Sequence, residues 1–186
     1  MTTISRQIMS ATDMQRSLAR IVLQILEQNN GVENLAVVGI HTGGVYLAER
    51  IKAIIAEREG VEIPIGTLDI TLYRDDWSLV SQNPMVKKTD IKFAVEDYTI
   101  VLVDDVLFTG RTIRAALDAI MDFGRPRCIQ LAVLIDRKCG RELPVQPNYV
   151  GLEVLETIDE RVHVTLKEKD GLEDEVVIVW QTGPKI

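Results

Sequence analysis

The sequence of 186 residues holds little of what marks secreted, metal-bound or membrane proteins. Its two cysteines, Cys128 and Cys139, are too few for a disulfide framework, and their spacing matches no zinc or redox motif. No run approaches the ~18 consecutive apolar residues of a membrane helix, and no apolar segment behind basic residues indicates export. We therefore expect a soluble, cytoplasmic protein.

The sequence also lacks an excess of basic residues. Its formal net charge is −7, whereas a protein that mainly grips a phosphate backbone is usually basic, so nucleic acid is disfavoured as the principal ligand. The length fits a single domain over residues 1–186, and 46% hydrophobic residues suffice for a core. Many acidic residues lie near the C-terminus, and we interpret them as a solvated face: Glu153, Glu156, Asp159, Glu160, Glu168, Asp170, Glu173, Asp174 and Glu175.

Apolar patterning predicts alternating helices and strands. The expected helices span residues 10–29, 45–57 and 112–123, and the expected buried strands span 35–40, 99–103 and 129–135, with 61–72 extended. This alternation predicts an α/β fold with a mainly parallel central sheet and helices on both faces. Alternation over 162–166 and 176–180 predicts a C-terminal hairpin.

Residues 73–92 form a long polar stretch without periodicity. A loop of this length inside a compact domain is uncommon and often serves as a lid.

The most informative segment is the apolar strand that ends in Asp104 and Asp105. Backbone amides at the start of the following helix, with the helix dipole and the hydroxyls of Thr109 and Thr112, suit a phosphate. Two carboxylates beside them suit ribose hydroxyls or hydrated magnesium. The alternative is a strand-end turn followed by an ordinary threonine N-cap.

Residues 101–112 resemble the phosphoribosyl pyrophosphate (PRPP) signature of the type I phosphoribosyltransferases. Residues 39–44, 69–76, 124–126 and 141–144 add a closer resemblance to the bacterial pyrimidine operon regulators that double as uracil phosphoribosyltransferases. The resemblance implies the type I phosphoribosyltransferase fold, with a hood to which residues from about 136 to 186 contribute. It implies a PRPP site made of Thr42, Gly43, Gly44, Asp104, Asp105, Val106, Leu107, Phe108, Thr109, Gly110, Arg111 and Thr112.

The resemblance also implies roles for these residues. Asp104 and Asp105 would handle the ribose hydroxyls, with Mg²⁺ carried by PRPP nearby and no direct protein ligand to the metal. The loop from His41 to Gly44 would cradle pyrophosphate, with a cis peptide bond expected between Thr42 and Gly43. Arg74, in the lid, would neutralise the leaving pyrophosphate.

The base is expected to be uracil. Purine enzymes of this family carry an acidic residue just before the Thr-Gly of the signature, and Phe108 occupies that position here. Asp136 could accept from uracil N3–H, and Tyr149, beside Val150, could stack on the ring. Equally open are a salt-bridged Asp136 and a Tyr149 at the edge of the core.

The resemblance leaves an alternative function, a regulator that senses uridine monophosphate (UMP) and binds an mRNA leader hairpin, with minor transferase activity. The first helix keeps Arg16 and Arg20, and further basic residues could form a patch: Arg125, Arg127, Arg137, Lys138 and Arg141. RNA-binding relatives tend to place a hydroxyl, an imidazole and a cation where this chain has Ala19, Leu23 and Gln28. We therefore expect specific RNA binding to be weakened or lost. A homodimer or higher homo-oligomer is also implied.

Overall fold

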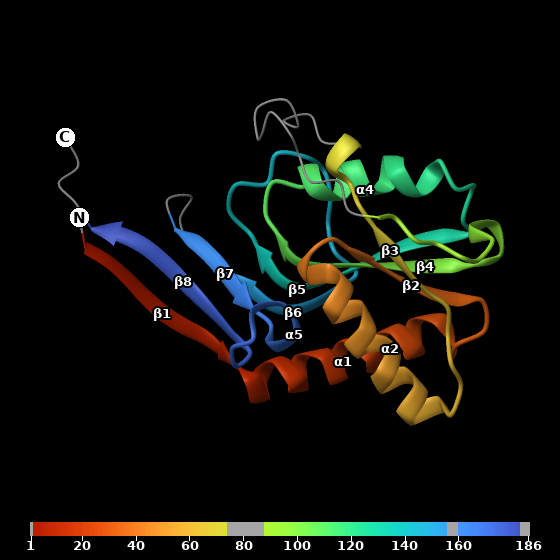
Figure 1. The fold of residues 1–186 in the computed structure, drawn as a ribbon, viewed down its shortest axis with the longest axis horizontal. Helices are drawn as coiled ribbons and strands as arrows, with labels where there is room; N and C mark the ends of the chain where they lie inside the picture. Colours follow the sequence, from red (N-terminus) through yellow and green to blue (C-terminus); the bar gives the residue numbers. More distant parts are fainter. Residues whose placement is uncertain (1, 74–87, 156–159, 183–186) are drawn as a thin grey trace.

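The computed structural model describes residues 2–73, 88–155 and 160–182, which form two β-sheets and their helices (Figure 1). The larger sheet has five parallel strands in the order β3-β2-β4-β5-β6, which confirms the predicted mainly parallel sheet. These strands are β2 (Leu35–Ile40), β3 (Ile65–Leu68), β4 (Thr99–Leu107), β5 (Cys128–Arg137) and β6 (Tyr149–Val154). The smaller sheet is antiparallel, in the order β1-β8-β7.

Helices cover both faces of the parallel sheet, as predicted. Helices α1 (Ala11–Asn29) and α2 (Gly43–Glu59) pack on one face, and α4 (Arg111–Met121) packs on the other (Figure 1). Strand β4 supplies apolar residues to both sides, with Val101 and Val103 facing α1 and α2 and Ile100 and Leu102 facing α4. This two-sided burial explains the continuous apolar run in the sequence.

Helix α1 follows its sequence signals at both ends. Ser10 caps it through its side chain, which accepts from the Asp13 backbone N–H, and the Asp13 carboxylate accepts from the Ser10 backbone in return. Asn30, in the left-handed conformation, and Gly31 end the helix. The predicted apolar stripe is buried at Met14, Leu18, Ile21, Val22 and Ile25.

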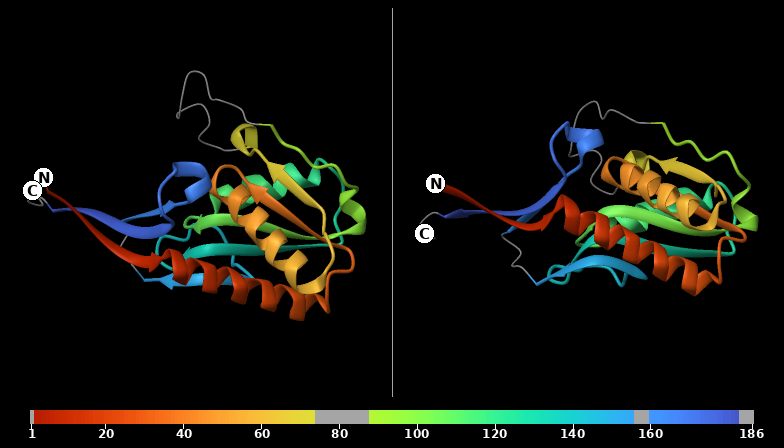
Figure 2. Two further views of the ribbon diagram at one scale, coloured as in Figure 1. Left: turned by 60° about the horizontal axis from the view of Figure 1, so that its bottom comes forward. Right: turned by 90° about the horizontal axis from the view of Figure 1, so that it is seen from below.

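The antiparallel sheet contains one strand that the sequence analysis missed. Strands β7 (Arg161–Thr165) and β8 (Glu175–Thr182) form the predicted hairpin around the short helix α5 (Lys167–Asp170). Strand β1 (Thr2–Ser10) pairs with β8, so the start of β1 and the end of β8 lie together at the tip of a projecting ribbon (Figures 1 and 2). Its residues 3–7 are exposed and mostly polar, so no strong alternation marks the strand.

The segment assigned to the hood divides between the two sheets. Residues 149–154 form β6, the edge strand of the parallel sheet, because they pair with β5 from Ala132 to Arg137. From this segment, β7 and β8 belong to the smaller sheet, and α5 lies in the connection between them. Strand β7 also contacts β4. The predicted lid, 73–92, lies mostly outside the described residues. At its borders, Tyr73 ends a 3₁₀ turn over residues 71–73, and Asp90 bridges to Thr67.

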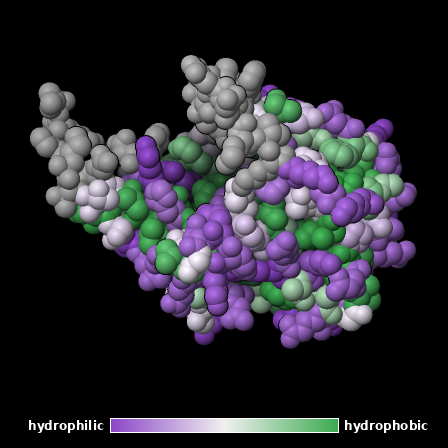
Figure 3. Space-filling view, in the orientation of Figure 1, coloured by the Kyte–Doolittle hydropathy of each residue, from purple (hydrophilic) through white to green (hydrophobic). Residues whose placement is uncertain are grey.

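Most of the face seen in Figure 3 carries hydrophilic side chains, with hydrophobic ones interspersed on the body and along the projecting ribbon. Ile4, on the β1 side of that ribbon, is 38% exposed. Within the described ranges, no helix combines the length and the apolar character needed to cross a membrane.

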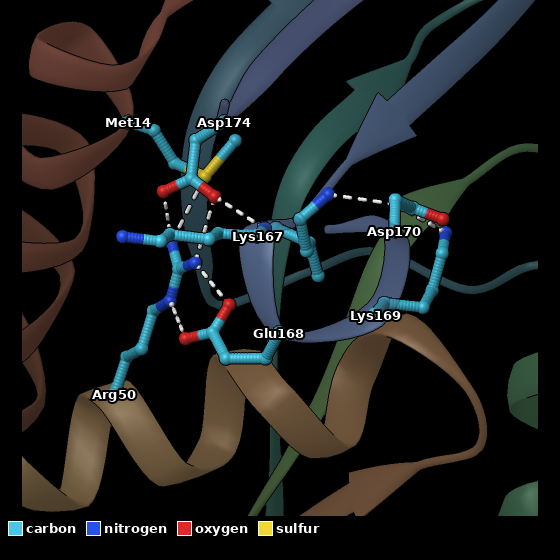
Figure 4. A network of polar contacts seen from close by, with 8 residues as sticks. Met14, Arg50, Lys167, Glu168, Lys169, Asp170 and Asp174 are labelled. Atoms are coloured by element: carbon cyan, nitrogen blue, oxygen red, sulfur yellow. Dashed lines mark hydrogen bonds and ion pairs between the residues drawn. The ribbon is translucent and has the colours of Figure 1, made fainter. Parts of the chain in front are cut away.

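Arg50 joins α2 to the connection between β7 and β8 through two carboxylates, one in α5 and one just before β8 (Figure 4). Its Nη1 and Nη2 lie 2.7 and 2.8 Å from the two carboxylate oxygens of Asp174, and its Nε donates to Glu168 Oε1 at 2.9 Å. These hydrogen bonds raise the pKa of Arg50 and lower the pKa of Glu168 and of Asp174. Two residues of the predicted solvated face are therefore ion-paired.

We predict that Arg50→Met lowers the free energy of unfolding by about 1–3 kcal/mol at pH 7, because a fork of charge-assisted hydrogen bonds is lost. Asp174 accounts for most of this effect, since its side chain is 17% exposed, whereas Glu168 is 42% exposed and screened by water. Urea unfolding measures the difference.

The difference should shrink as the pH falls. Both carboxyl groups have a lowered pKa in the folded state, so their stabilisation is present above the unfolded pKa, near 4, and is lost as the pH falls through the folded pKa. Arg16→Met is the matched control, because Arg16 lies 3.9 Å from Asp13 on an exposed surface. Equal effects of the two variants would contradict the role of Arg50.

Candidate functional site

Asp104 and Asp105 lie near the carboxyl end of β4, the edge where open α/β sheets bind ligands. Strand β4 continues to Leu107, four residues beyond the predicted Val103, because it stays paired with β5 as far as Leu107 and Asp136. Both aspartates are therefore held by sheet hydrogen bonding and not by a free turn.

Asp104 is only 6% exposed, whereas Asp105 is half-buried. Burial, followed by the charge of the neighbouring Asp105, raises the pKa of Asp104 well above its usual range. Asp104 Oδ1 accepts from the Asp105 backbone N–H at 3.0 Å, and Asp105 Oδ1 accepts from the Val106 N–H at 2.8 Å. The free site thus concentrates negative charge that hydroxyl donors or a cation would relieve.

The start of α2 approaches the end of β4 so closely that only glycine fits. A Cβ on Gly43 would overlap the Asp105 carboxylate, and one on Gly44 would overlap the Val103 carbonyl oxygen. Behind them, a Cβ on Gly39 would lie 2.5 Å from Val45 Cα. The structure therefore brings the predicted pyrophosphate loop directly against the predicted ribose site.

The cis peptide bond lies one residue earlier than expected. It joins His41 to Thr42, and not Thr42 to Gly43. Helix α2 already begins at Gly43, two residues before the predicted Val45, with Thr42 as its N-cap residue. Thus Gly43 takes helical geometry, and the connection between β2 and α2 is reduced to His41 and Thr42.

The predicted phosphate loop lies in the turn between β4 and α4. Gly110 adopts a φ of 92°, in the left-handed region, and precedes the first residue of α4, Arg111. The N-cap residue Gly110 has no side chain to cap this helix, so the first-turn backbone N–H groups that follow Arg111 remain available to an anion. The Thr109 hydroxyl accepts from the Arg111 N–H at 3.4 Å, and Thr112 lies in the first turn.

Asp136 lies beside a cavity of about 230 Å³ next to the phosphate loop, lined by Asp136, Lys138, Arg141, Leu143, Pro144, Val145 and Gln146. Asp136 is completely buried and forms ion pairs with Arg141 and, at 2.9 Å, with Lys138. The structure therefore matches the salt-bridged alternative. The contact with uracil N3–H stays a prediction.

Tyr149 is a core residue, which corrects the prediction that it stacks on the base. Its side chain is 1% exposed, and its hydroxyl donates to Gln130 Oε1 at 2.8 Å. Asn29 exchanges hydrogen bonds with the same glutamine at 2.9 and 3.0 Å. The ring is held between α1 and the sheet because its hydroxyl finds partners there. The side chain of Val150 packs against the core cluster on the α4 side.

The sequence analysis missed the roles of Arg141 and Arg137 at this site. Arg141 Nη1 donates to the Phe108 carbonyl oxygen at 2.6 Å, and the guanidinium of Arg137 stacks over the Phe108 ring at 4.0 Å. The spacing of Asp136, Lys138 and Arg141 after a buried strand was a signal for an ion-pair cluster. The other predicted catalytic residue, Arg74, lies outside the described residues.

A family model described as the phosphoribosyl transferase domain matches residues 6–169 of this chain. The chain is 56% identical over 174 residues to the Bifunctional protein PyrR of Chloroflexus aurantiacus, covering 94% of each protein. It is 54% identical over 181 residues to the Bifunctional protein PyrR of Caldicellulosiruptor bescii, covering 97% of this chain and 98% of that protein.

Solved structures show the same fold at low sequence identity. The hypoxanthine phosphoribosyl transferase of Trypanosoma cruzi matches with a TM-score of 0.71 at 14% identity, covering 93% of this chain and 90% of that one. A hypoxanthine-guanine phosphoribosyltransferase from Bacillus anthracis matches with a TM-score of 0.66 at 19% identity, covering 92% and 95%. At this identity the likeness concerns the fold alone.

We predict that Asp104→Asn stabilises the ligand-free protein at pH 7. A carboxyl group whose folded pKa is raised binds more protons in the folded than in the unfolded state, so stability falls as the pH rises from about 4 toward the folded pKa. Asparagine keeps the acceptor for the Asp105 N–H without this penalty. Each kcal/mol relieved raises the melting temperature by about 2–4 °C.

Thermal unfolding at pH 4 and at pH 7 tests this expectation. The gain of Asp104→Asn over the wild-type protein should be present at pH 7 and small at pH 4. Asp97→Asn, which removes an exposed carboxylate, is the matched control. A lower melting temperature for Asp104→Asn at pH 7 would show that the buried charge is not a source of instability.

Proposed function

The chain belongs to the phosphoribosyltransferase family, and from that premise we propose that it transfers the phosphoribosyl group of PRPP to uracil, forming UMP and pyrophosphate. The observation that carries this proposal is the placement of two aspartates between two loops. The α4 N-terminus lies on one side and the glycine-rich start of α2 on the other. A sugar phosphate with a pyrophosphate group would be held at both ends.

The residues act by positioning and by electrostatics. We assign the ribose hydroxyls to Asp104 and Asp105, the 5′-phosphate to residues 107–112, and the pyrophosphate to the loop of Thr42, Gly43 and Gly44. The anomeric carbon becomes cation-like as the pyrophosphate leaves, so correct placement of the base and stabilisation of the leaving group supply the rate. Arg74, outside the described residues, is assigned to that leaving group.

Mg²⁺ fits the site as a companion of PRPP. Two adjacent carboxylates are hard oxygen ligands that suit a hydrated magnesium ion, and the described residues contain no cluster of three or more histidine, cysteine or acidic side chains around a common point. When bound, the ion would neutralise the charge of the pyrophosphate. Asp104 and Asp105 are the residues that would hold its water ligands.

The choice of a pyrimidine depends on Phe108. The Arg137 guanidinium stacks over its ring, and Gly140 lies against the ring. An apolar side chain therefore occupies the position at which the resemblance implies an acidic residue in purine enzymes. A phenyl ring offers neither a proton acceptor nor a donor to a purine imidazole. Uracil has no imidazole ring, so it needs no hydrogen-bond partner at this position.

We expect magnesium-dependent release of pyrophosphate with PRPP and uracil, and turnover of hypoxanthine and guanine at least ~10-fold slower, because the purines find no partner at Phe108. A coupled pyrophosphate assay over a panel of bases measures this. The control is Asp105→Asn, which removes one charged acceptor and should lower the rate about tenfold. Faster turnover of a purine than of uracil would sink the assignment of the base.

A second candidate function is regulation of pyrimidine genes through an mRNA leader hairpin that responds to UMP. The close relatives carry the name Bifunctional protein PyrR, and the sequence resembles pyrimidine operon regulators. Some of the basic residues, however, already have partners within the protein. Arg20 donates to the carbonyl oxygens of Val150 and Gly151 at 3.0 and 2.5 Å, and Arg137 is 5% exposed. The cytoplasmic location and the homo-oligomer stay predictions.

We therefore expect RNA binding that is weak, with a Kd of roughly micromolar or above at physiological salt, and salt-sensitive, because it depends on a small number of exposed cations that contact phosphates. A filter-binding titration with the leader RNA of the protein's own pyrimidine operon, with and without UMP, measures it. An unrelated RNA hairpin of equal length is the control. Nanomolar binding that UMP strengthens would restore the full regulator role.

A further inference from the structure

The segment that follows β5 grips the phosphate loop from outside. We name residues 140–145 the bracket. Two successive backbone N–H groups of the bracket, from Glu142 and Leu143, donate to the Thr109 carbonyl oxygen at 3.0 and 3.1 Å. The turn that precedes α4 is therefore held by hydrogen bonds from a segment more than thirty residues away, which fixes the direction of its own amides.

Close packing reinforces this grip. A Cβ on Gly140, which has a φ of 78°, would overlap the Phe108 ring, so both the backbone conformation and the available space require glycine. On the other side, a Cβ on Gly110 would lie 3.3 Å from Leu143 Cβ. The bracket therefore contacts the phosphate loop at Phe108, Thr109 and Gly110.

Arg141 is the one bracket side chain that reaches two functional segments at once. Its Nη1 donates to the Phe108 carbonyl oxygen at 2.6 Å, while its Nη2 pairs with the fully buried Asp136. The guanidinium is planar and rigid, so it sets the Phe108 carbonyl at a defined position relative to the end of β5. The side chain is 20% exposed, so water screens these contacts little.

Another charged contact of the bracket is a weaker candidate. Arg111 pairs with Glu142 at 2.6 Å, but the two side chains are 50% and 49% exposed. An exposed pair of this kind adds little rigidity, because solvent competes for both groups.

We propose that Arg141 is a positioning residue of the transferase, which presets the phosphate loop for the 5′-phosphate by holding the Phe108 carbonyl against Asp136. The inference rests on the proposed function, because it concerns the same phosphate site. The amides of an anion site are effective only when they point at the ligand before it arrives, since ordering them on binding subtracts from affinity. Arg141 acts through the loop backbone and not by touching the phosphate.

Binding of ribose 5-phosphate, measured by calorimetry, tests this inference without depending on the base. We expect Arg141→Met to weaken binding at least tenfold, equivalent to about 1.4 kcal/mol. Arg141→Lys should recover part of the affinity, because a single ammonium reaches one of the two partners. Arg125→Met, which removes an exposed arginine before β5, is the control for lost charge and should bind within twofold of the wild-type protein.

A variant that leaves Asp136 short of a partner could unfold, so the double variant Asp136→Asn/Arg141→Met is measured beside it, with melting temperatures for all. The double variant should still bind ribose 5-phosphate at least tenfold more weakly. Unchanged affinity in folded Arg141→Met, equal losses in Arg125→Met, or a loss confined to RNA binding would each overturn the inference. A wild-type protein that binds neither ribose 5-phosphate nor PRPP would instead refute the proposed function itself.

Discussion

The close approach of two backbones at the carboxyl edge of the parallel sheet governs the whole site. Helix α2 begins against the end of β4 because Gly44 carries no Cβ, which would collide with the Val103 carbonyl oxygen, while a Cβ on Gly43 would displace the Asp105 carboxylate. This contact places the loop after β2 within reach of the carboxylates on β4. If a side chain widened the distance between the start of α2 and the end of β4, the predicted pyrophosphate and ribose positions would move apart. One bound molecule could then no longer be held at both positions in a reactive geometry.

At the same edge, two neighbouring carboxylates create an unfavourable electrostatic environment. Asp104 lies almost without solvent beside a second carboxylate, a combination that raises its pKa and that no purely structural requirement explains. The core on both sides of the sheet keeps the strand end in place despite this penalty. A ligand with hydroxyl groups, accompanied by a cation, would offset this penalty, so the penalty would favour binding of such a ligand.

Contacts distant in sequence complete the site from outside. The bracket holds the predicted phosphate loop, and Arg50 ties α2, which begins at the predicted pyrophosphate loop, to the connection between β7 and β8. The parallel sheet therefore supplies the reacting groups, while later segments of the chain hold the loops between its strands and helices. This division suits a reaction that depends on placement more than on acid–base chemistry.

Local patterns were sufficient for the frame and for the strand end, turn and helix start around the predicted phosphate site. Helix α1 begins after the N-cap residue Ser10 and ends at Asn30 and Gly31, as its sequence indicates, and β4 is apolar on both faces. The run from Asp104 to Thr112 carries its own strand end, turn and helix start, so its chemistry can be read without knowing the fold.

Tertiary structure decided the rest, because a pattern reports which side of an element is apolar but not which distant group meets it. Strand β1 exists through its pairing with β8, at the other end of the chain. Tyr149 turned inward because Gln130 and Asn29 accept and donate around it, and Asp136 was covered because Arg141 and Lys138 reach it. The Arg20 guanidinium likewise donates a hydrogen bond to the Val150 carbonyl oxygen, 130 residues away in the sequence. Polar side chains such as these take whichever partner burial brings close, and burial is a property of the folded chain.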